Sequence, residues 1–219
     1  MHDMRIIKGL ESKNKIYSCT KKEFYEQGYR RSTIQHITAE AGVPLGLFTY
    51  YFKTKDNVVE LIYTDFMNQI RKALEAFEWY NEDTSFFKNT CIYFVFYESV
   101  LQDPNTARFF YEVIQKDFKG RLLHDWLTEA YRTYLADYRI KMKENEFTML
   151  LSFDFGGRRE IFLNYFNKKL NVSQQKLIHM VTMVVPRYMQ IPKKEIDRVY
   201  KKVYSNLGQV DISSFNMLK

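Results

Sequence analysis

The feature that most constrains the fold is a run of apolar residues that recur at every third or fourth position. Between residues 58 and 77 the run comprises Val58, Ile62, Phe66, Ile70, Leu74 and Phe77. This spacing places the side chains on one face of an α-helix, whereas a strand would divide them between two faces. Similar spacing recurs along the chain, and only 8 glycines and 4 prolines interrupt its 219 residues. So few breakers exclude a sandwich or barrel of many strands, and we expect an all-α fold.

The same pattern predicts some nine or ten helices. Their expected ranges are 13–27, 33–41, 44–52, 54–77, 87–103, 105–117, 120–142, 146–169, 174–189 and 192–206. Gly28 is expected to stop the first helix, and Ser32 to cap the second, with Gln35 three residues on as in a capping box. Thr54 is expected to cap the fourth helix, and Pro186 to bend a late one. We expect a small three-helix head joined directly to a larger antiparallel helical bundle.

Positive charge is concentrated near the N-terminus. The chain has 33 Lys and Arg against 26 Asp and Glu, a net charge of +7. Residues 1–55 contain ten of these cations and five acids, a net of +5, which leaves 23 against 21, or +2, for the remainder. A solvated basic face and a nucleic-acid-binding head both explain this distribution, so the motif content has to decide.

The three short helices before residue 53, with Gly42 in the turn between the second and third, are typical of a helix-turn-helix unit. If Phe48 and Phe52 form the buried face of the third helix, Gly46 and Tyr50 point away from the core, because successive residues turn by about 100°. A small residue beside a hydrogen-bonding aromatic suits close approach to the major groove of DNA.

Two further residues of the head suggest contact with phosphate. Lys55 lies in the first turn of the fourth helix, where a cation opposes the helix dipole. A phosphate held jointly by Lys55 and the N–H groups of a helix end would explain that position. Thr33, at the start of the second helix, can make a similar backbone contact.

Taken together, these residues resemble a known family. They are Ile16, Phe24, Gly28-Tyr29, Ser32-Thr33-Ile34, Ile37 to Val43, Gly46, and Tyr50 to Asp56. Residues 10–70, with the helix-turn-helix motif at about 33–52, resemble the DNA-binding head of the TetR family of bacterial repressors. The resemblance implies a two-fold homodimer, a palindromic double-stranded DNA operator, and a ligand-binding and dimerisation body over 71–210 from which a small-molecule effector relieves repression. It also implies DNA-facing positions for Thr33, Leu45, Gly46, Thr49, Tyr50, Tyr51 and Lys55.

The recognition helix departs from the family pattern. Pro44 and Leu45 replace the small hydroxyl and basic residues that usually open it, Leu47 stands where Thr is common, Phe48 where Leu is, and Thr49 where an aromatic is. We therefore expect fewer charged contacts with DNA and more apolar contact with thymine methyl groups.

The body is rich in aromatic residues, with 17 between Phe77 and Tyr138. Aromatics at helical spacing usually form core, but this set is larger than one helix can bury, which favours a cavity that they line. The candidates that combine a ring with a polar group are Trp79, Tyr93, Tyr97, Tyr111, Trp126, Tyr131 and Tyr134. We expect an apolar or aromatic effector, with a cation over the ring faces as an open alternative.

Under the resemblance, two late helices, at about 155–169 and 174–189, form the dimer interface. The residues expected there are Phe155, Gly156, Gly157, Phe162, Phe166, Leu177, Val181, Val184 and Tyr188. The glycine pair has two interpretations, a break between two helices or close helix approach across the dimer.

Nothing in the sequence supports catalysis, a metal or a cofactor. The four histidines and two cysteines lack metal-ligand spacing, and no nucleotide-binding, hydrolase or zinc-protease motif is present. No run has the length of a signal peptide core or a membrane span, so we expect a cytoplasmic protein. The leading hypothesis is a ligand-responsive repressor. The alternatives are an architectural or low-specificity DNA-binding protein, and a helical enzyme or carrier that retains the head.

Overall fold

The computed structural model describes residues 2–116 and 122–219, with side chains from Lys8 onward. Its described part contains eleven α-helices and no strand, which confirms the all-α fold. The helices are α1 (His2–Arg31), α2 (Ile34–Glu40), α3 (Leu45–Phe52), α4 (Lys55–Leu74), α5 (Glu78–Asn81), α6 (Ser85–Gln102), α7 (Pro104–Gln115), α8 (His124–Asp137), α9 (Glu144–Phe166), α10 (Gln174–Tyr188) and α11 (Lys193–Leu207). A short 3₁₀ turn, Ile212–Ser214, follows. Residues 117, 120 and 121 of the expected helices lie outside the described residues.

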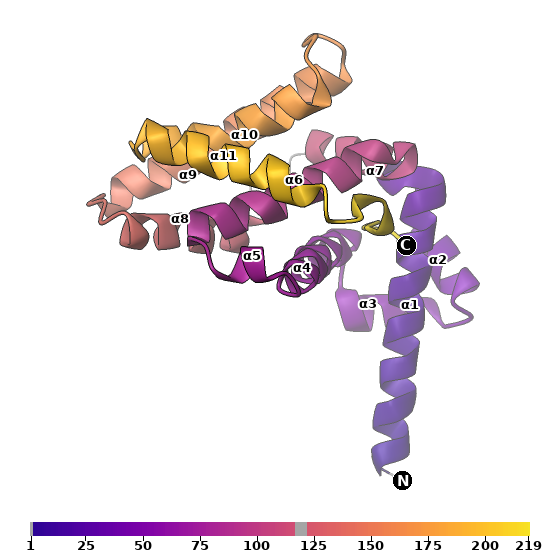
Figure 1. Cartoon of the computed structure of the whole chain (residues 1–219). Coiled ribbons are helices and arrows are strands. Elements are labelled where there is room, and N and C mark those ends of the chain that lie inside the picture. The colour runs from indigo at the N-terminus through magenta and orange to yellow at the C-terminus, as the bar shows by residue number, and fades with distance from the viewer. Residues whose placement is uncertain (1, 117–121) are drawn as a thin grey trace.

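The helix α1 is longer than the sequence pattern predicted. It begins at His2 instead of residue 13, and its first turns project beyond α2 and α3 on the side away from the body (Figure 1). Gly28 does not end the helix but kinks it, with φ of 81°, a conformation that a glycine adopts at little cost. The last turn after the kink continues to Arg31.

The cap of α2 is Thr33 and not Ser32. The Thr33 hydroxyl accepts a hydrogen bond from the His36 N–H at 3.1 Å. Ser32 is buried, and its hydroxyl donates to the carbonyl of Gly28 instead. The kink therefore directs Ser32 back towards α1, which leaves the next hydroxyl to satisfy the free N–H groups of α2.

The fourth helix follows its sequence pattern closely. Thr54 caps it by accepting from the Asn57 N–H at 3.2 Å, and the apolar positions from Val58 to Leu74 are buried. Phe77 lies beyond the end of α4, directly before α5, a four-residue helix that the spacing did not predict.

The body packs around α6, which contacts α4, α7, α8, α10 and α11 (Figure 1). Its central position explains why twelve of its residues are buried on every side of the helix. α7 lies between the head and the body and packs along α1 on one side and against α6 and α9 on the other.

The glycine pair does not break a helix. Gly156 and Gly157 lie inside α9, which is continuous from Glu144 to Phe166, so the interpretation of a break was wrong. A Cβ atom built on either glycine would meet nothing within 4 Å. Both glycines therefore face open space, and no close packing within the described chain accounts for them.

Candidate nucleic-acid interface and body cavity

The third helix is anchored by two phenylalanines and presents its other face to solvent. Phe48 is 0% and Phe52 5% exposed, whereas Tyr50 is 76% and Leu45 49% exposed. Gly46 lies on the exposed side, where a Cβ atom would meet nothing within 4 Å. The phase of α3 is therefore the one that the buried phenylalanines predict, with Tyr50 at the outermost point.

Several residues of the expected DNA-facing set share one surface. Thr33 at the cap of α2 and Leu45 and Thr49 on α3 line one shallow hollow between the two helices. Ile34 and Gln35 complete it. Tyr50, which follows Thr49 on α3, is exposed to solvent.

Tyr51 differs from its neighbour in burial. Its ring meets that of Tyr50 edge-on at a centroid distance of 5.0 Å. Its hydroxyl oxygen lies 3.3 Å from the place where a Cβ atom of Gly9 would stand, so Tyr51 packs over α1. The absence of a side chain at Gly9 makes room for this contact between α1 and α3.

Lys55 joins α4 to the end of α1. Its Nζ donates to the carbonyls of Tyr29, at 2.8 Å, and Ser32, at 2.6 Å, and lies over the Tyr29 ring. Burial lowers the pKa of Lys55, and the nearby Lys116 ammonium lowers it further. The Lys55 cation therefore satisfies carbonyls at the C-terminus of α1. The negative end of the α1 dipole stabilises the cation there and compensates for the unfavourable positive end of the α4 dipole.

A second set of contacts ties α7 to the head. Lys116 forms an ion pair with Asp56 at 2.7 Å, and Tyr29 donates to the same carboxylate. Although burial opposes it, hydrogen bonds from Lys116 and Tyr29 hold the pKa of Asp56 below its ordinary value. One turn earlier, the Glu112 carboxylate accepts from the Arg30 N–H at 2.8 Å.

Two turns before Lys116, Arg108 donates to the carbonyls of Tyr25, at 2.8 Å, and Glu26, at 3.0 Å. Arg108, Glu112 and Lys116 are four residues apart and therefore share one face of α7. We call these three residues the α7 clamp. Arg108 and Glu112 bond to the backbone of the last turns of α1, and Lys116 pairs with Asp56, which also accepts from Tyr29 of α1.

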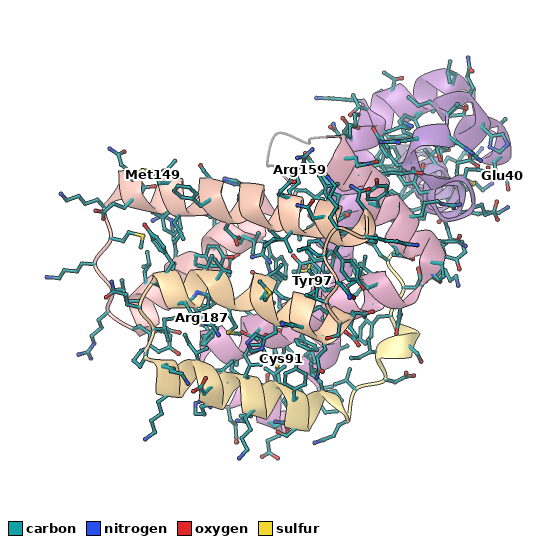
Figure 2. The ribbon with its side chains drawn as sticks, turned by 90° about the horizontal axis from the view of Figure 1, so that it is seen from above. Glu40, Cys91, Tyr97, Met149, Arg159 and Arg187 are labelled. Carbon is teal, nitrogen blue, oxygen red and sulfur yellow. The ribbon has the colours of Figure 1, made fainter. Side chains whose placement is uncertain are left out.

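The opposite face of α7 lines an apolar cavity of about 100 Å³ in the body. Its apolar walls include Phe96, Phe110, Val113, Ile114, Leu127 and Phe162. The polar side chains on its lining are Tyr63, Tyr97, Arg158 and Arg159. Figure 2 shows Arg159 on α9 and Tyr97 below it, towards the interior.

Arg158 is the central polar group beside this cavity. Its guanidinium pairs with both Asp154 oxygens at 2.8 Å and donates to the hydroxyls of Tyr97 and Tyr131, each at 3.0 Å. The side chains of Arg158 and Asp154 are only 10% and 3% exposed. Burial raises the pKa of both tyrosines, so they remain neutral hydroxyls.

Two residues that line the cavity each have a buried polar atom without a hydrogen-bond partner among the described residues, the Tyr63 hydroxyl and the Arg158 Nε. Tyr63 is 1% exposed and belongs to α4. A buried polar atom without a partner costs about 1–3 kcal/mol, so each such atom calls for an explanation.

The aromatic residues expected at an effector site are dispersed. Tyr97 lines the cavity. The Tyr131 hydroxyl accepts a hydrogen bond from Arg158, which also lines the cavity, and the Tyr134 ring packs against the Tyr131 ring at a centroid distance of 5.8 Å. Tyr93 is buried elsewhere in the core, and Tyr111 bonds to Asn167.

The two tryptophans lie away from this cavity. Trp126 faces a separate groove with Arg71 4.1 Å from its ring, and Trp79 packs on Phe77.

Tyr63, Arg158 and Arg159 were not among the residues predicted from the sequence. The only signal for the arginines was their place between Phe155 and Phe162, on a helix that was assigned to the dimer.

The residues expected at a dimer interface divide between core and surface. Leu177 and Val181 are buried in the protomer, Phe155 and Phe162 line the cavity, and Phe166 packs against Phe110. Val184 and Tyr188 are 49% and 55% exposed. Three residues not expected there are also exposed apolar groups of α9 and α10, namely Met149, Phe153 and Met180.

Together with Gly156 and Gly157, the five exposed side chains make what we call the α9–α10 face, defined by Met149, Phe153, Met180, Val184 and Tyr188. Figure 2 looks onto α9 and α10, with Met149 near one end of α9. Phe153, at 74% exposed, is the most exposed of them. The side chains recur every four residues along each helix, so they share one side of α9 and one side of α10.

The described residues contain no cluster of three or more His, Cys, Asp or Glu side chains that could hold a metal ion. Within the same residues, no helix is long and apolar enough to cross a membrane.

The fold and the exposed third helix define a helix-turn-helix protein with a helical body. Residues 16–62 match the family model of the bacterial regulatory proteins of the tetR family. The head of this chain is therefore similar to the DNA-binding part of that family.

One similar protein is the uncharacterized HTH-type transcriptional regulator YdgC of Bacillus subtilis (strain 168), 29% identical over 69 residues. That alignment covers 32% of this chain and 35% of YdgC, so it spans about a third of the relative. The structure of RolR in complex with resorcinol matches with a TM-score of 0.59 over 89% of this chain and 95% of RolR. The identity is 14%, so this likeness concerns the fold.

Proposed function

We propose that the protein is a dimeric, ligand-responsive transcription regulator that binds a palindromic DNA operator. The observation that carries the proposal is the exposed outer face of α3, held in place by the buried Phe48 and Phe52. In this proposal residues 10–70 bind DNA, and residues 71–210 bind the effector and a second copy of the chain.

The contacts with DNA follow from the exposed surface of the head. Tyr50 and Thr49 reach base edges in the major groove, while Leu45 contacts thymine methyl groups. Thr33 and Tyr51 contact the backbone, and Gly46 allows the groove wall to approach α3. Lys55 contributes by orienting α4 through its two carbonyl contacts, so that the N–H groups at the start of α4 face phosphate.

Dimerisation uses the α9–α10 face. Its five apolar side chains need a partner, and the two glycines leave room for a helix of the second copy to approach α9. A two-fold axis through this face would present two α3 helices to successive major grooves, about 34–36 Å apart. The expected dimer residues that are buried in the protomer, such as Leu177 and Val181, pack in the core beneath the α9–α10 face.

The effector occupies the cavity beside Tyr97, and its binding releases the protein from the operator. Two helices connect this cavity with the head. α4 contains Tyr63 on the lining and Asp56 at the head, and α7 contains Val113 on the lining and the α7 clamp on its other face. The resorcinol complex of RolR supports a small aromatic effector. A ligand that binds better to one arrangement of these helices would shift the population away from the DNA-binding spacing.

Capture of genomic fragments by the purified protein, followed by gel shift, tests the proposal. We expect specific fragments to be retained, and the double variant Thr49→Ala with Tyr50→Ala to lose them. Lys72→Ala is the matched control, because Lys72 is an exposed cation on α4 far from α3. If the folded wild-type protein selects no sequence at low salt, the proposal is wrong.

A further inference from the structure

The cavity beside Arg158 has features that restrict the chemistry of its ligand. At about 100 Å³ it is somewhat smaller than the cavity of about 150 Å³ that binds benzene in an engineered protein. Modest relaxation of its walls would admit one six-membered ring. The walls are mainly aromatic and aliphatic, which suits a flat apolar body.

The charges at the cavity exclude a cationic ligand. Arg158 is neutralised by Asp154, and Arg159 also lines the cavity. Arg159 donates to the carbonyls of Ile114 and Gln115, and the described residues place no carboxylate in an ion pair with it. The lining therefore carries an excess of positive charge, and a cation over the aromatic rings would be repelled.

The unpartnered atoms indicate what the ligand supplies. The Arg158 Nε can only donate a hydrogen bond, and the Tyr63 hydroxyl can donate or accept one. Both residues line the same cavity, and both atoms are buried without a partner among the described residues. A single oxygen on a bound ring would satisfy both and would remove the cost of leaving them unmade.

We propose that this cavity binds a one-ring aromatic molecule, neutral or anionic, whose oxygen accepts a hydrogen bond from Arg158 Nε and pairs with the Tyr63 hydroxyl. The inference rests on the proposed function only in assigning the cavity to the effector. It adds that the site selects ligands with an oxygen substituent on the ring over ligands with a positively charged substituent.

Calorimetric titration of the full-length protein with four probes of similar size tests this inference. The probes are phenol, benzoate, toluene and benzylammonium. We expect phenol or benzoate to bind at least about tenfold more tightly than toluene, because only the oxygen satisfies the two buried atoms. Benzylammonium should not bind. The ratio of benzoate to phenol affinity distinguishes an anionic from a neutral ligand, and either order agrees with the proposal.

Two variants locate the contact. Tyr63→Phe removes a hydroxyl that bonds to no described residue, so it should fold normally, weaken the oxygenated probe by about tenfold and leave toluene unchanged. Tyr93→Phe is the matched control, because it removes another buried, unpartnered hydroxyl that does not line the cavity. It should change neither probe.

Equal affinity for phenol and toluene, binding of benzylammonium, or equal effects of the two variants would overturn the inference. So would the absence of any binding at millimolar concentration. A parallel gel shift with a selected operator separates the two proposals. DNA binding without probe binding refutes the ligand class alone, whereas probe binding without sequence-specific DNA binding refutes the regulatory function and leaves the ligand class standing.

Discussion

Tyr50 is the residue whose exposure is hardest to explain without a partner. Its ring is 76% exposed on a helix whose other aromatic residues are packed. Tyr50→Ala should weaken binding to a selected operator by about 1–3 kcal/mol, the value of a good base contact. The free energy of unfolding should change by less than about 0.5 kcal/mol, because no buried group is lost. Fluorescence anisotropy and urea unfolding measure the two quantities.

Phe48→Ala is the opposite case and serves as the control. Phe48 is fully buried, so its truncation should cost about 3–5 kcal/mol of stability. Unchanged operator affinity in Tyr50→Ala would show that α3 does not read DNA through its outer face.

Asp83 gives a prediction about acid stability. Its side chain is 6% exposed and accepts from Arg198 at 2.9 Å and Lys202 at 2.7 Å. Although burial raises it, these hydrogen bonds hold the pKa of Asp83 well below its ordinary value of 3.8. Because the folded pKa is the lower one, this stabilisation is present above about pH 4 and is lost as the pH falls through the folded pKa.

Asp83→Asn should therefore be less stable than the wild type by about 2 kcal/mol at pH 7. The difference should shrink below pH 4, because the Asp83 carboxyl of the unfolded wild-type chain takes up a proton there while that of the folded chain stays charged. Urea unfolding at pH 7 and pH 3 measures it. A difference that is independent of pH would mean that the charge of Asp83 contributes nothing.

Single residues also show the limits of sequence reasoning. Thr54 was predicted correctly as a cap, because a threonine directly precedes a regular apolar pattern there. Two adjacent hydroxyls stood before α2, and the choice of Thr33 over Ser32 depends on the kink at Gly28, which no local pattern encodes. Arg158 was missed because its partners, Tyr97 and Tyr131, come from two other helices.

Among the elements, α7 is one of the two helices that connect the cavity with the head, and its contact with the kink of α1 can be tested. Gly28 has φ of 81° and ψ of 173°, a region open almost only to glycine. A Cβ atom there would stand 2.7 Å from a Glu112 oxygen. Gly28→Ala should lower the free energy of unfolding by about 1–3 kcal/mol and also weaken operator binding, because the α7 clamp must shift.

Gly208→Ala is the matched control for this substitution. Gly208 has φ of −61°, and a Cβ atom there would meet nothing within 4 Å. Alanine should be neutral or stabilise by up to about 1 kcal/mol through the unfolded state. Equal unfolding midpoints for the two variants, measured in urea, would contradict the role of Gly28.

Element boundaries were predictable where one helix face alone determines them. The apolar face predicted for α4 was correct as far as Leu74. Phe77 was wrongly assigned to the same helix, because its spacing continues the apolar pattern. The expected range 146–169 ran through Gly156 and Gly157, yet a break stayed an open alternative, because two glycines inside a helix cost about 1 kcal/mol each.

At the scale of the whole molecule, the α9–α10 face predicts the state of assembly. Val184→Glu places a charge at the middle of this face, where Val184 is 49% exposed in the protomer. The wild type should be a dimer by light scattering at micromolar concentration, and the variant should be monomeric, because a charge cannot be buried unpaired in an apolar interface. It should also lose operator binding, since two heads are needed.

Leu10→Glu is the control for this change, because Leu10 is 58% exposed on α1, far along the chain from α9 and α10. It should remain a dimer. A wild-type monomer, or a Val184→Glu variant that stays dimeric, would refute the proposed interface.

The overall architecture was easier to predict than its cavity. The all-α fold follows from periodicity and scarce breakers, and the head follows from its motif. The cavity is formed where α4, α6, α7, α8 and α9 meet, and a sequence pattern gives the apolar face of each helix but not the rotation of one helix against another. The aromatic residues were therefore recognised as a group, but of the candidates for the effector site only Tyr97 lines this cavity.

The central claim is sequence-specific binding of DNA by the head. The most direct measurement is the affinity of the full-length protein for a selected genomic operator and for a scrambled duplex of equal length, over a range of salt concentrations. We predict a ratio of at least about 10³ at physiological salt, with both affinities falling as salt rises. Affinities that fall steeply with salt but differ by less than about tenfold between the two duplexes would contradict the account and would identify an architectural DNA-binding protein.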